Sequence, residues 1–340
     1  MKKIFAMLLA LIMMLSLAAC GSADNNSDAN ANTDGDEGDK IVIGVSLHDL
    51  TSDGYAANLI GIKDLAASKG NVEIKAVSAE GSAETQISQI EDFITSGVDG
   101  IILLPVDSSA LAGKVKEAVD AGIPVVCMDR SVDGDIATCT IESDNYQHGV
   151  ESADLMLAAA EAQGMKAEDL KVLELLGAQS TSAGLERHEG FAGRCEELGI
   201  TIVSALPTEW DNEVAYKAVL DGFQANQDIN AIFEASDIAM HSGVSAALDQ
   251  LGKYVAVGED GHIIIITSVD GGPNGIEAVK AGYIDAMAEQ GLLIMGSEAL
   301  ETVLSAINGD AIADTHIQLS PVAVTKDNAD SDELWPNKIK

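Results

Sequence analysis

The chain has 340 residues, of which 19 are Lys or Arg and 55 are Asp or Glu, so its formal net charge at pH 7 is −36. This length allows one or two globular domains with a substantial core, and 47% of the residues are apolar. Proteins that bind DNA or RNA neutralise phosphates with clustered Lys and Arg, and this sequence has no such cluster. The composition therefore argues against a nucleic-acid partner.

The first 19 residues have the pattern of an export signal. Lys2 and Lys3 precede an almost entirely apolar run over residues 4–17, which is short for a membrane-spanning helix. The run ends in the letters LAACG, which resemble the lipobox of bacterial lipoproteins, where the Cys is lipidated and becomes the new N-terminus. We expect a signal peptide over residues 1–19 and a lipid on Cys20 that holds the chain at the cell membrane, on its outer face or its periplasmic side. An ordinary cleaved signal with an incidental Cys is the alternative.

Residues 20–40 consist mainly of Asn, Asp, Ser, Gly and Ala, so they offer too little apolar area to fold. We expect a disordered acidic tether over these residues. Its Asp and Gly spacing faintly resembles a calcium loop, but the closing Glu of such a loop is missing, and a solvated linker is the favoured interpretation.

Three further cysteines, Cys127, Cys139 and Cys195, show no CxxC spacing, so neither a disulfide framework nor a zinc site is indicated. We interpret them as small buried apolar residues. A single disulfide between Cys127 and Cys139 is left open, because the chain is expected outside the cytoplasm.

From Lys40 onward, short apolar runs alternate with stretches of helical periodicity. In the first half the predicted strands cover residues 41–46, 72–77, 100–104 and 124–128, and the predicted helices cover residues 57–69, 84–96 and 109–121. Each run is apolar almost throughout, as expected for a parallel strand that is covered on both faces. The helices between the strands are expected to be right-handed crossovers.

The same alternation starts again in the second half, which predicts a second lobe. After a strand over residues 137–142, the expected strands are residues 171–176, 201–205, 231–235, 262–269 and 284–288, and the helices are residues 145–162, 182–198, 213–225, 240–251 and 273–281. Residues 254–261 contain two glycines and predict a hairpin-like insertion. Residues 327–340 form a polar tail that we expect to be loosely attached.

Polar side chains directly follow the predicted strands, and ligands of parallel sheets bind beyond the carboxyl ends of strands. The candidates are Asp129, Arg130, Arg187, Ser236, Asp237, Asp270 and Gln290. Carboxylates accept two hydrogen bonds and a guanidinium donates several in one plane, so such a set can clasp the adjacent hydroxyls of a sugar. For Asp129 and Arg130, the alternative is a helix cap and a surface ion pair.

Two aromatic residues, Tyr55 and Trp210, fall in loops after predicted strands. Their rings can cover the C–H side of a sugar ring, and packing in a lid or a core is the alternative.

At these residues the chain resembles the sugar-binding branch of the type I periplasmic binding proteins, the ribose-binding-protein-like solute receptors of ABC importers. The resemblance spans residues 40–326. Its carriers are GIPVV leading into Asp129-Arg130, SDN at residues 143–145, TS at 181–182 with RHEGF at 187–191, VDG at 269–271 and the stretch 282–290. The resemblance implies an α/β fold of two doubly wound parallel-sheet lobes joined by a hinge of three crossings.

The resemblance places these crossings near residues 143–144, 290–291 and 318–319. The first lobe would then comprise residues 41–143 and 291–318, and the second lobe residues 144–290 and 319–326. It also implies that Asp129, Arg130, Arg187, Asp270 and Gln290 bind the sugar, that Trp210 stacks on it, and that Tyr55 takes the place of the paired aromatics that follow the first strand.

Several positions depart from the ribose receptors of this family. The loop over residues 48–54 is longer, Leu104 stands in place of Asn, Ser236 or Asp237 replaces another Asn, and Val269 replaces Phe. The ligand therefore stays open among ribose, the pyranoses and polyols such as inositol.

We expect a monomeric, lipid-tethered extracytoplasmic receptor that delivers a monosaccharide to the permease and ATPase of an ABC importer, with no cofactor and no metal. An enzyme is disfavoured, since GxSxG, GxGxxG, HExxH and a phosphate-binding loop are absent from the sequence and its six His lack ligand spacing. A sugar-responsive repressor would need an N-terminal DNA-reading module. A sensory receptor of the same fold, presenting a sugar or a furanosyl signal to a membrane kinase or chemoreceptor, stays open as the alternative.

Overall fold

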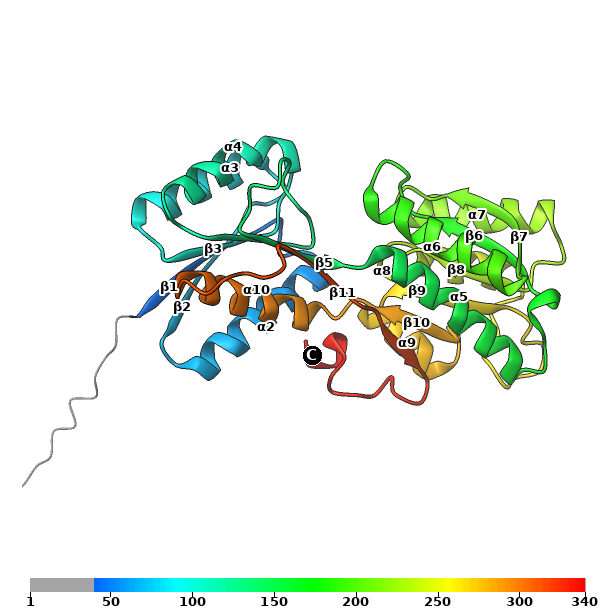
Figure 1. Ribbon diagram of the computed structural model, residues 1–340. Coiled ribbons are helices and arrows are strands. Elements are labelled where there is room, and N and C mark those ends of the chain that lie inside the picture. The colour runs from blue at the N-terminus through cyan, green and yellow to red at the C-terminus, as the bar shows by residue number, and fades with distance from the viewer. Residues whose placement is uncertain (1–39, 340) are drawn as a thin grey trace, which may run out of the picture. The chain divides into compact units, whose positions relative to one another are not determined.

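The computed structural model describes residues 40–339, which form two α/β lobes, each built on a six-stranded sheet (Figure 1). Cys20, the expected signal peptide and nearly all of the expected tether lie outside the described residues. The prediction of two lobes with parallel-sheet cores is confirmed.

The sheet of the first lobe is parallel throughout, with the strand order β11-β5-β4-β3-β1-β2. Its strands are β1 (Ile41–Leu47), β2 (Val72–Ser78), β3 (Gly100–Leu103), β4 (Val125–Met128), β5 (Cys139–Ser143) and β11 (His316–Leu319). One face is covered by α2 (Asp53–Lys69) and α10 (Leu292–Ile307), and the other by α3 (Ala83–Ser96) and α4 (Ser108–Asp120) (Figure 1).

The sheet of the second lobe has the order β12-β10-β9-β8-β6-β7, and only β12 runs antiparallel to its neighbour. Its strands are β6 (Lys171–Leu176), β7 (Thr201–Pro207), β8 (Ala231–Glu234), β9 (Ile265–Asp270), β10 (Ala286–Glu289) and β12 (Val322–Thr325). Its α-helices are α5 (Asn145–Ala162), α6 (Ser182–Leu198), α7 (Asn212–Ala225), α8 (Asp237–Gln250) and α9 (Pro273–Ala281). Helix α5 packs against α6, and α7 packs against α8.

The chain changes sheet three times, because late segments return to each lobe. It passes from β5 to β6, from β10 through α10 to β11, and from β11 to β12. Each lobe therefore ends with an edge strand that comes from the last tenth of the chain.

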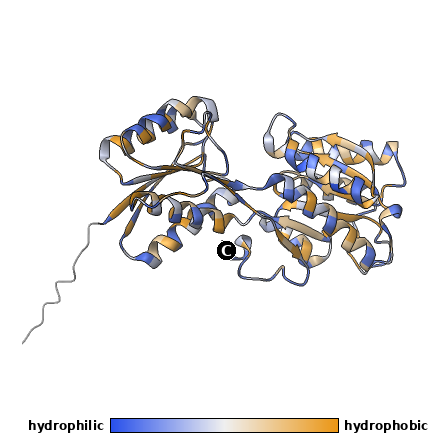
Figure 2. Ribbon diagram, viewed as in Figure 1, coloured by the Kyte–Doolittle hydropathy of each residue, from blue (hydrophilic) through white to orange (hydrophobic). Residues whose placement is uncertain are grey.

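The cores follow the apolar runs of the sequence. Strands β3, β4, β8 and β9 are buried at every position, as a parallel strand covered on both faces must be. Figure 2 shows the strands of the second lobe largely in the hydrophobic colour, whereas the helices alternate between hydrophobic and hydrophilic colours. Cys127, Cys139 and Cys195 are buried free thiols, which confirms their interpretation as small core residues.

The hairpin expected over residues 254–261 is wrong, and β9 begins at Ile265 rather than at residue 262. The segment is a series of turns, because Gly258 and Gly261 adopt left-handed backbone angles and the His262 ring bonds the Val255 carbonyl at 2.7 Å. Backbone groups that a hairpin would pair are thus committed to turns and side chains.

The polar tail is also attached more firmly than its composition predicts. Trp335, in the short helix α11 (Trp335–Lys338), is fully buried, and Leu334 beside it is 3% exposed. Two large apolar side chains outweigh the polarity of their neighbours, since each buried one stabilises by about 1.5–3 kcal/mol.

Candidate functional site

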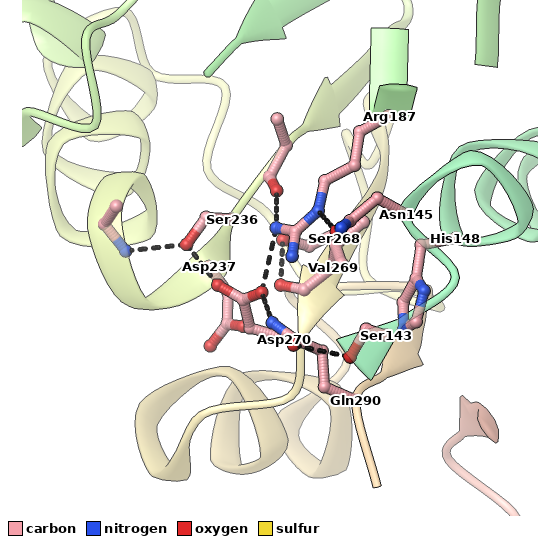
Figure 3. A network of polar contacts seen from close by, with 12 residues as sticks. Ser143, Asn145, His148, Arg187, Ser236, Asp237, Ser268, Val269, Asp270 and Gln290 are labelled. Carbon is pink, nitrogen blue, oxygen red and sulfur yellow. Dashed lines mark hydrogen bonds and ion pairs between the residues drawn. The ribbon is translucent and has the colours of Figure 1, made fainter. Parts of the chain in front are cut away.

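A buried ion pair lies at the carboxyl ends of the strands in the second lobe (Figure 3). Arg187 Nη1 is 2.9 Å from Asp270 Oδ1, and the two side chains are only 6% and 10% exposed. The same Nη1 donates to the Ala235 carbonyl at 2.6 Å, and Nε donates to Asn145 Oδ1 at 3.0 Å. Three elements thus fix one guanidinium: α5, β9 and the loop after β8.

The local sequence explains how α6 presents Arg187. The Thr181 side chain caps the helix by accepting from the Gly184 amide at 3.1 Å, and Gly199 ends it in a left-handed conformation. A Cβ on Gly149 of α5 would lie 2.2 Å from the Arg187 carbonyl oxygen, so the two helices cross with their backbones nearly touching. This close crossing brings the Arg187 side chain within reach of Asn145.

The Asp270 carboxylate is the centre of a wider network. It accepts hydrogen bonds from the Ser236 hydroxyl and from Gln290 Nε2, in addition to Arg187. Gln290 Oε1 in turn accepts from the Ser143 hydroxyl at 2.8 Å, so the network reaches the end of β5 in the first sheet (Figure 3). Asp270 has a φ of 92°, which an L-residue adopts only where its surroundings enforce it.

Trp210 lies against this pair. The Arg187 Cζ atom is 5.8 Å from the centre of the indole ring, within the range of a cation–π contact. Gly177, just after β6, makes room for the ring, since a Cβ there would lie 2.0 Å from the indole Cη2. Glu209 and Trp210 both have positive φ, so the loop holds the ring by a tight turn.

A second group of predicted residues meets in the first lobe, where Asp129 and Arg130 follow β4 and Tyr55 lies in the first turn of α2 rather than in a loop. Arg130 Nη2 donates to the Tyr55 hydroxyl at 2.8 Å, and Arg130 Nε lies 3.6 Å from Asp129 Oδ2. Asp129 has a φ of 65°, and its amide donates to the Ile141 carbonyl at 2.8 Å. The His48 ring lies beside Tyr55, with 5.5 Å between the ring centres.

The charges of the two groups act on one another. Burial raises the pKa of Asp129. The positive charges of Arg130 and Arg187 lower this pKa in part, and the negative charge of Asp270 raises it. Burial, together with the Asp129 charge, raises the pKa of Tyr55 to about 12, so its hydroxyl stays protonated and can donate. Residues from both lobes therefore share one electrostatic environment.

The structure places Asp237 in a different position from the one expected of a ligand contact. Its Oδ1 accepts from the amides of Gly271 and Gly272 at 2.9 and 3.1 Å, and its Oδ2 accepts from Gly272 at 3.0 Å. The carboxylate thus occupies the N-terminus of α9, where the helix dipole favours a negative charge. Burial still raises its pKa to about 7. Asp237 thus supports the backbone after Asp270, and its contact with a sugar stays a prediction.

Of the predicted residues, the structure brings Arg187, Trp210, Ser236, Asp270 and Gln290 together in one group and Tyr55, Asp129 and Arg130 in another. Two contributors, Asn145 and Ser143, were not among the predicted site residues. Their signal was present, because both belong to the polar triplet at the end of β5, which carries part of the family resemblance. Asp144 caps α5 by accepting from the Gln147 amide, and this leaves Asn145 available to Arg187. Within residues 40–339, no cluster of His, Cys, Asp or Glu is arranged to hold a metal ion.

Comparisons with known proteins agree with this architecture. The periplasmic binding protein domain family matches residues 43–311. The ribose import binding protein of Bacillus subtilis is 27% identical over 315 residues, which cover 93% of this chain and 96% of that protein.

Two solved structures share the fold over nearly their whole length. An ABC transporter periplasmic solute binding protein from Actinobacillus succinogenes, with bound D-allose, has a TM-score of 0.72 at 26% identity and covers 85% of this chain and 99% of its own. An ABC transporter solute binding protein from Bacillus halodurans, with bound myo-inositol, has a TM-score of 0.70 at 26% identity, covering 88% and 99%. By this match and by its two parallel-sheet lobes, the chain belongs to the periplasmic binding protein family and has the type I fold.

Proposed function

We propose that this protein is an extracytoplasmic receptor that binds a monosaccharide or a related polyol between its two lobes and delivers it to an ABC importer. The observation that carries the proposal is the buried Arg187–Asp270 pair beneath Trp210. Such a pair offers fixed donors and acceptors to hydroxyls, which both donate and accept, while an indole face covers C–H groups.

The charge balance of the site favours a neutral ligand. Arg187 pairs with Asp270, and Arg130 lies beside Asp129, so each cationic group has a carboxylate next to it. A sugar phosphate or a sugar acid would need an unpaired cation in the site to offset the free energy that its charged group loses when it leaves water. A neutral polyhydroxyl compound meets no such cost.

The relatives support an importer rather than a sensor. The names of the three proteins above describe import or ABC transport, and two of them hold a neutral polyhydroxyl compound. These names favour import over the presentation of a signal to a kinase or chemoreceptor.

The proposal includes three further features of the chain. The protein performs no catalysis, it acts as a monomer, and the lipid on Cys20 with the tether over residues 20–40 holds it at the membrane. Within residues 40–339, no helix is both long and apolar enough to cross a membrane. Incorporation of labelled palmitate into the full chain, and its loss in Cys20→Ser, would test the anchor.

A thermal-shift panel of pentoses, hexoses and inositols tests the proposed ligand class. A ligand that binds only the folded state stabilises it by about 4 kcal/mol at a thousandfold excess over its dissociation constant. We expect at least one neutral compound to raise the melting temperature and the matching sugar acids to leave it unchanged. A panel with no effect would contradict the proposal, and a response limited to acids would contradict the argument from charge.

A further inference from the structure

The C-terminal segment joins the two lobes through a pair of neighbouring side chains. After β12 the chain turns back, and Leu334 packs into the core of the second lobe with Val324 and Ala329. The next residue, Trp335, packs into the core of the first lobe with Leu293 and other side chains of α10. Consecutive residues thus anchor the same short segment in both lobes.

Trp335 also contacts the backbone of the site directly. Its indole Nε1 donates to the carbonyl oxygen of Asp270 at 3.4 Å, over a distance of 65 residues in sequence. That carbonyl also accepts from the Gln290 amide at 3.3 Å. The indole is fully buried, so no water competes for its N–H group.

Trp335 also lies close to the neighbouring strand. Trp335 and Glu289 line the same cavity, and Glu289 Oε2 accepts from the Gly291 amide at 2.9 Å. Glu289 pairs with Asp270 in the register of β9 and β10. Trp335 therefore bonds the end of β9 at Asp270 and lies beside the end of β10 at Glu289.

The backbone at Asp270 needs such support. Its left-handed φ of 92° costs an L-residue on the order of 1–3 kcal/mol, and the conformation persists only where the surroundings enforce it. The orientation of the carboxylate depends on this angle, since the side chain moves with the Cα. A change in the hydrogen bonding of the Asp270 carbonyl would therefore be felt at the side chain.

We propose that Trp335 is a positioning residue for the ligand site: its indole N–H holds the Asp270 carbonyl at the end of β9, the same carbonyl that accepts from the Gln290 amide, so that Asp270 and Gln290 face the ligand. The proposal rests on the proposed function for its effect on affinity. Its effect on the backbone stands independently. Trp335 touches no ligand itself.

The test compares Trp335→Phe, which keeps an aromatic ring but removes the indole donor, with Leu334→Ala. The control residue lies in the same segment and is nearly as buried, but it belongs to the core cluster of the second lobe. Both variants are expected to unfold at lower temperature. Affinity is measured well below the melting temperatures, with a sugar that stabilises the unmutated protein in the thermal-shift panel. Only Trp335→Phe is expected to bind this sugar about fivefold more weakly, because a hydrogen bond of this kind contributes about 1 kcal/mol.

Amide hydrogen exchange of the ligand-free chain gives a readout that needs no sugar. In Trp335→Phe we expect the amides of residues 269–272 and 289–292 to exchange several-fold faster than in the unmutated protein. In Leu334→Ala we expect the exchange rates of these amides to stay the same. Unchanged exchange in Trp335→Phe, or equal acceleration in both variants, overturns the proposal whatever the affinities. If no sugar binds the unchanged chain, the proposed function fails, and exchange alone decides this inference.

If Trp335→Phe does not fold, a measurement on the unmutated protein still tests the proposal. In the ¹⁵N-labelled unchanged chain, the indole N–H proton of Trp335 is expected to resist exchange with solvent for hours. Exchange within minutes would show that the hydrogen bond to Asp270 is not made and would overturn the proposal.

Discussion

Asp270 holds together more of the candidate site than any neighbouring residue. Its carboxylate accepts from Arg187, Ser236 and Gln290, while its carbonyl accepts from Trp335 and the Gln290 amide. Removing one member of a buried charge pair leaves the other without compensation, at a cost of about 3–5 kcal/mol. Residues at this site are therefore expected to matter for folding as well as for binding.

Arg187→Ala tests both roles at once. We expect the free energy of unfolding to fall by about 3 kcal/mol, because Asp270, Asn145 and the Ala235 carbonyl lose a shared donor, and the sugar-induced thermal shift to disappear. Arg194→Ala, on the same helix but paired at the surface with Asp154 and Glu197, is expected to change stability by less than about 1 kcal/mol and to keep the shift. Equal behaviour of the two variants in denaturant titrations and thermal-shift assays would place the site elsewhere.

Glu289 predicts a pH dependence of stability. Burial raises its pKa to about 8, partly offset by the Trp335 amide, so the folded state holds this proton more tightly than the unfolded chain. The stabilisation of the folded state by this bound proton is present in full below pH about 4.5 and is lost as the pH rises through 8. In Glu289→Gln, the decline of unfolding free energy between pH 5 and 8 should be shallower by up to about 1.4 kcal/mol per pH unit.

Denaturant titrations at several pH values measure this slope. Glu277→Gln serves as the control, since its carboxylate pairs with Lys280 at the surface, 68% exposed. The control should keep the original slope. A Glu289→Gln variant with that same slope would contradict the assignment.

At the scale of elements, the crossing of α5 and α6 determines where the guanidinium lies. Gly149→Ala would put a methyl group 2.2 Å from the Arg187 carbonyl oxygen, so the helices must separate. We expect a loss of about 1–3 kcal/mol in stability together with weaker sugar binding. Gly193→Ala on α6 meets only the Tyr146 hydroxyl at 3.9 Å, and it should leave binding unchanged while stabilising the helix by up to about 1 kcal/mol. Calorimetry of both variants with the panel sugar decides between these outcomes.

The elements themselves were largely predictable, because a strand covered on both faces shows an apolar run that little else produces. The ends of α6 and α9 agree with the expected residues, since caps and glycines mark them. The surroundings of Asp237 could not be predicted from the sequence. A carboxylate after a strand looks the same whether it faces a ligand or the N-terminus of a helix nearby in space. Trp335 was missed for the same reason, because its partners are distant in sequence.

At the scale of the whole molecule, the formal net charge of −36 spreads repulsion over the surface. Salt screens such repulsion, and the compact state, where the charges lie closer, benefits more. Raising NaCl from about 10 to 500 mM at pH 7 is expected to increase the melting temperature by about 2–4 °C, which corresponds to about 1 kcal/mol. At pH 4, where many carboxylates take up protons, the increase should be smaller. A melting temperature that is insensitive to salt at pH 7 would contradict this expectation.

The late return of α10 and β11 to the first lobe has a consequence for the order of folding. The core beneath α2 includes Met295, Leu300 and Val303, and β11 completes the sheet only at residues 316–319. A ribosome must therefore synthesise nearly the entire polypeptide before the first lobe can complete its fold. Until then the described segment over residues 40–143 lacks its edge strand β11 and its covering helix α10, so we expect it to fold only when synthesis is nearly complete.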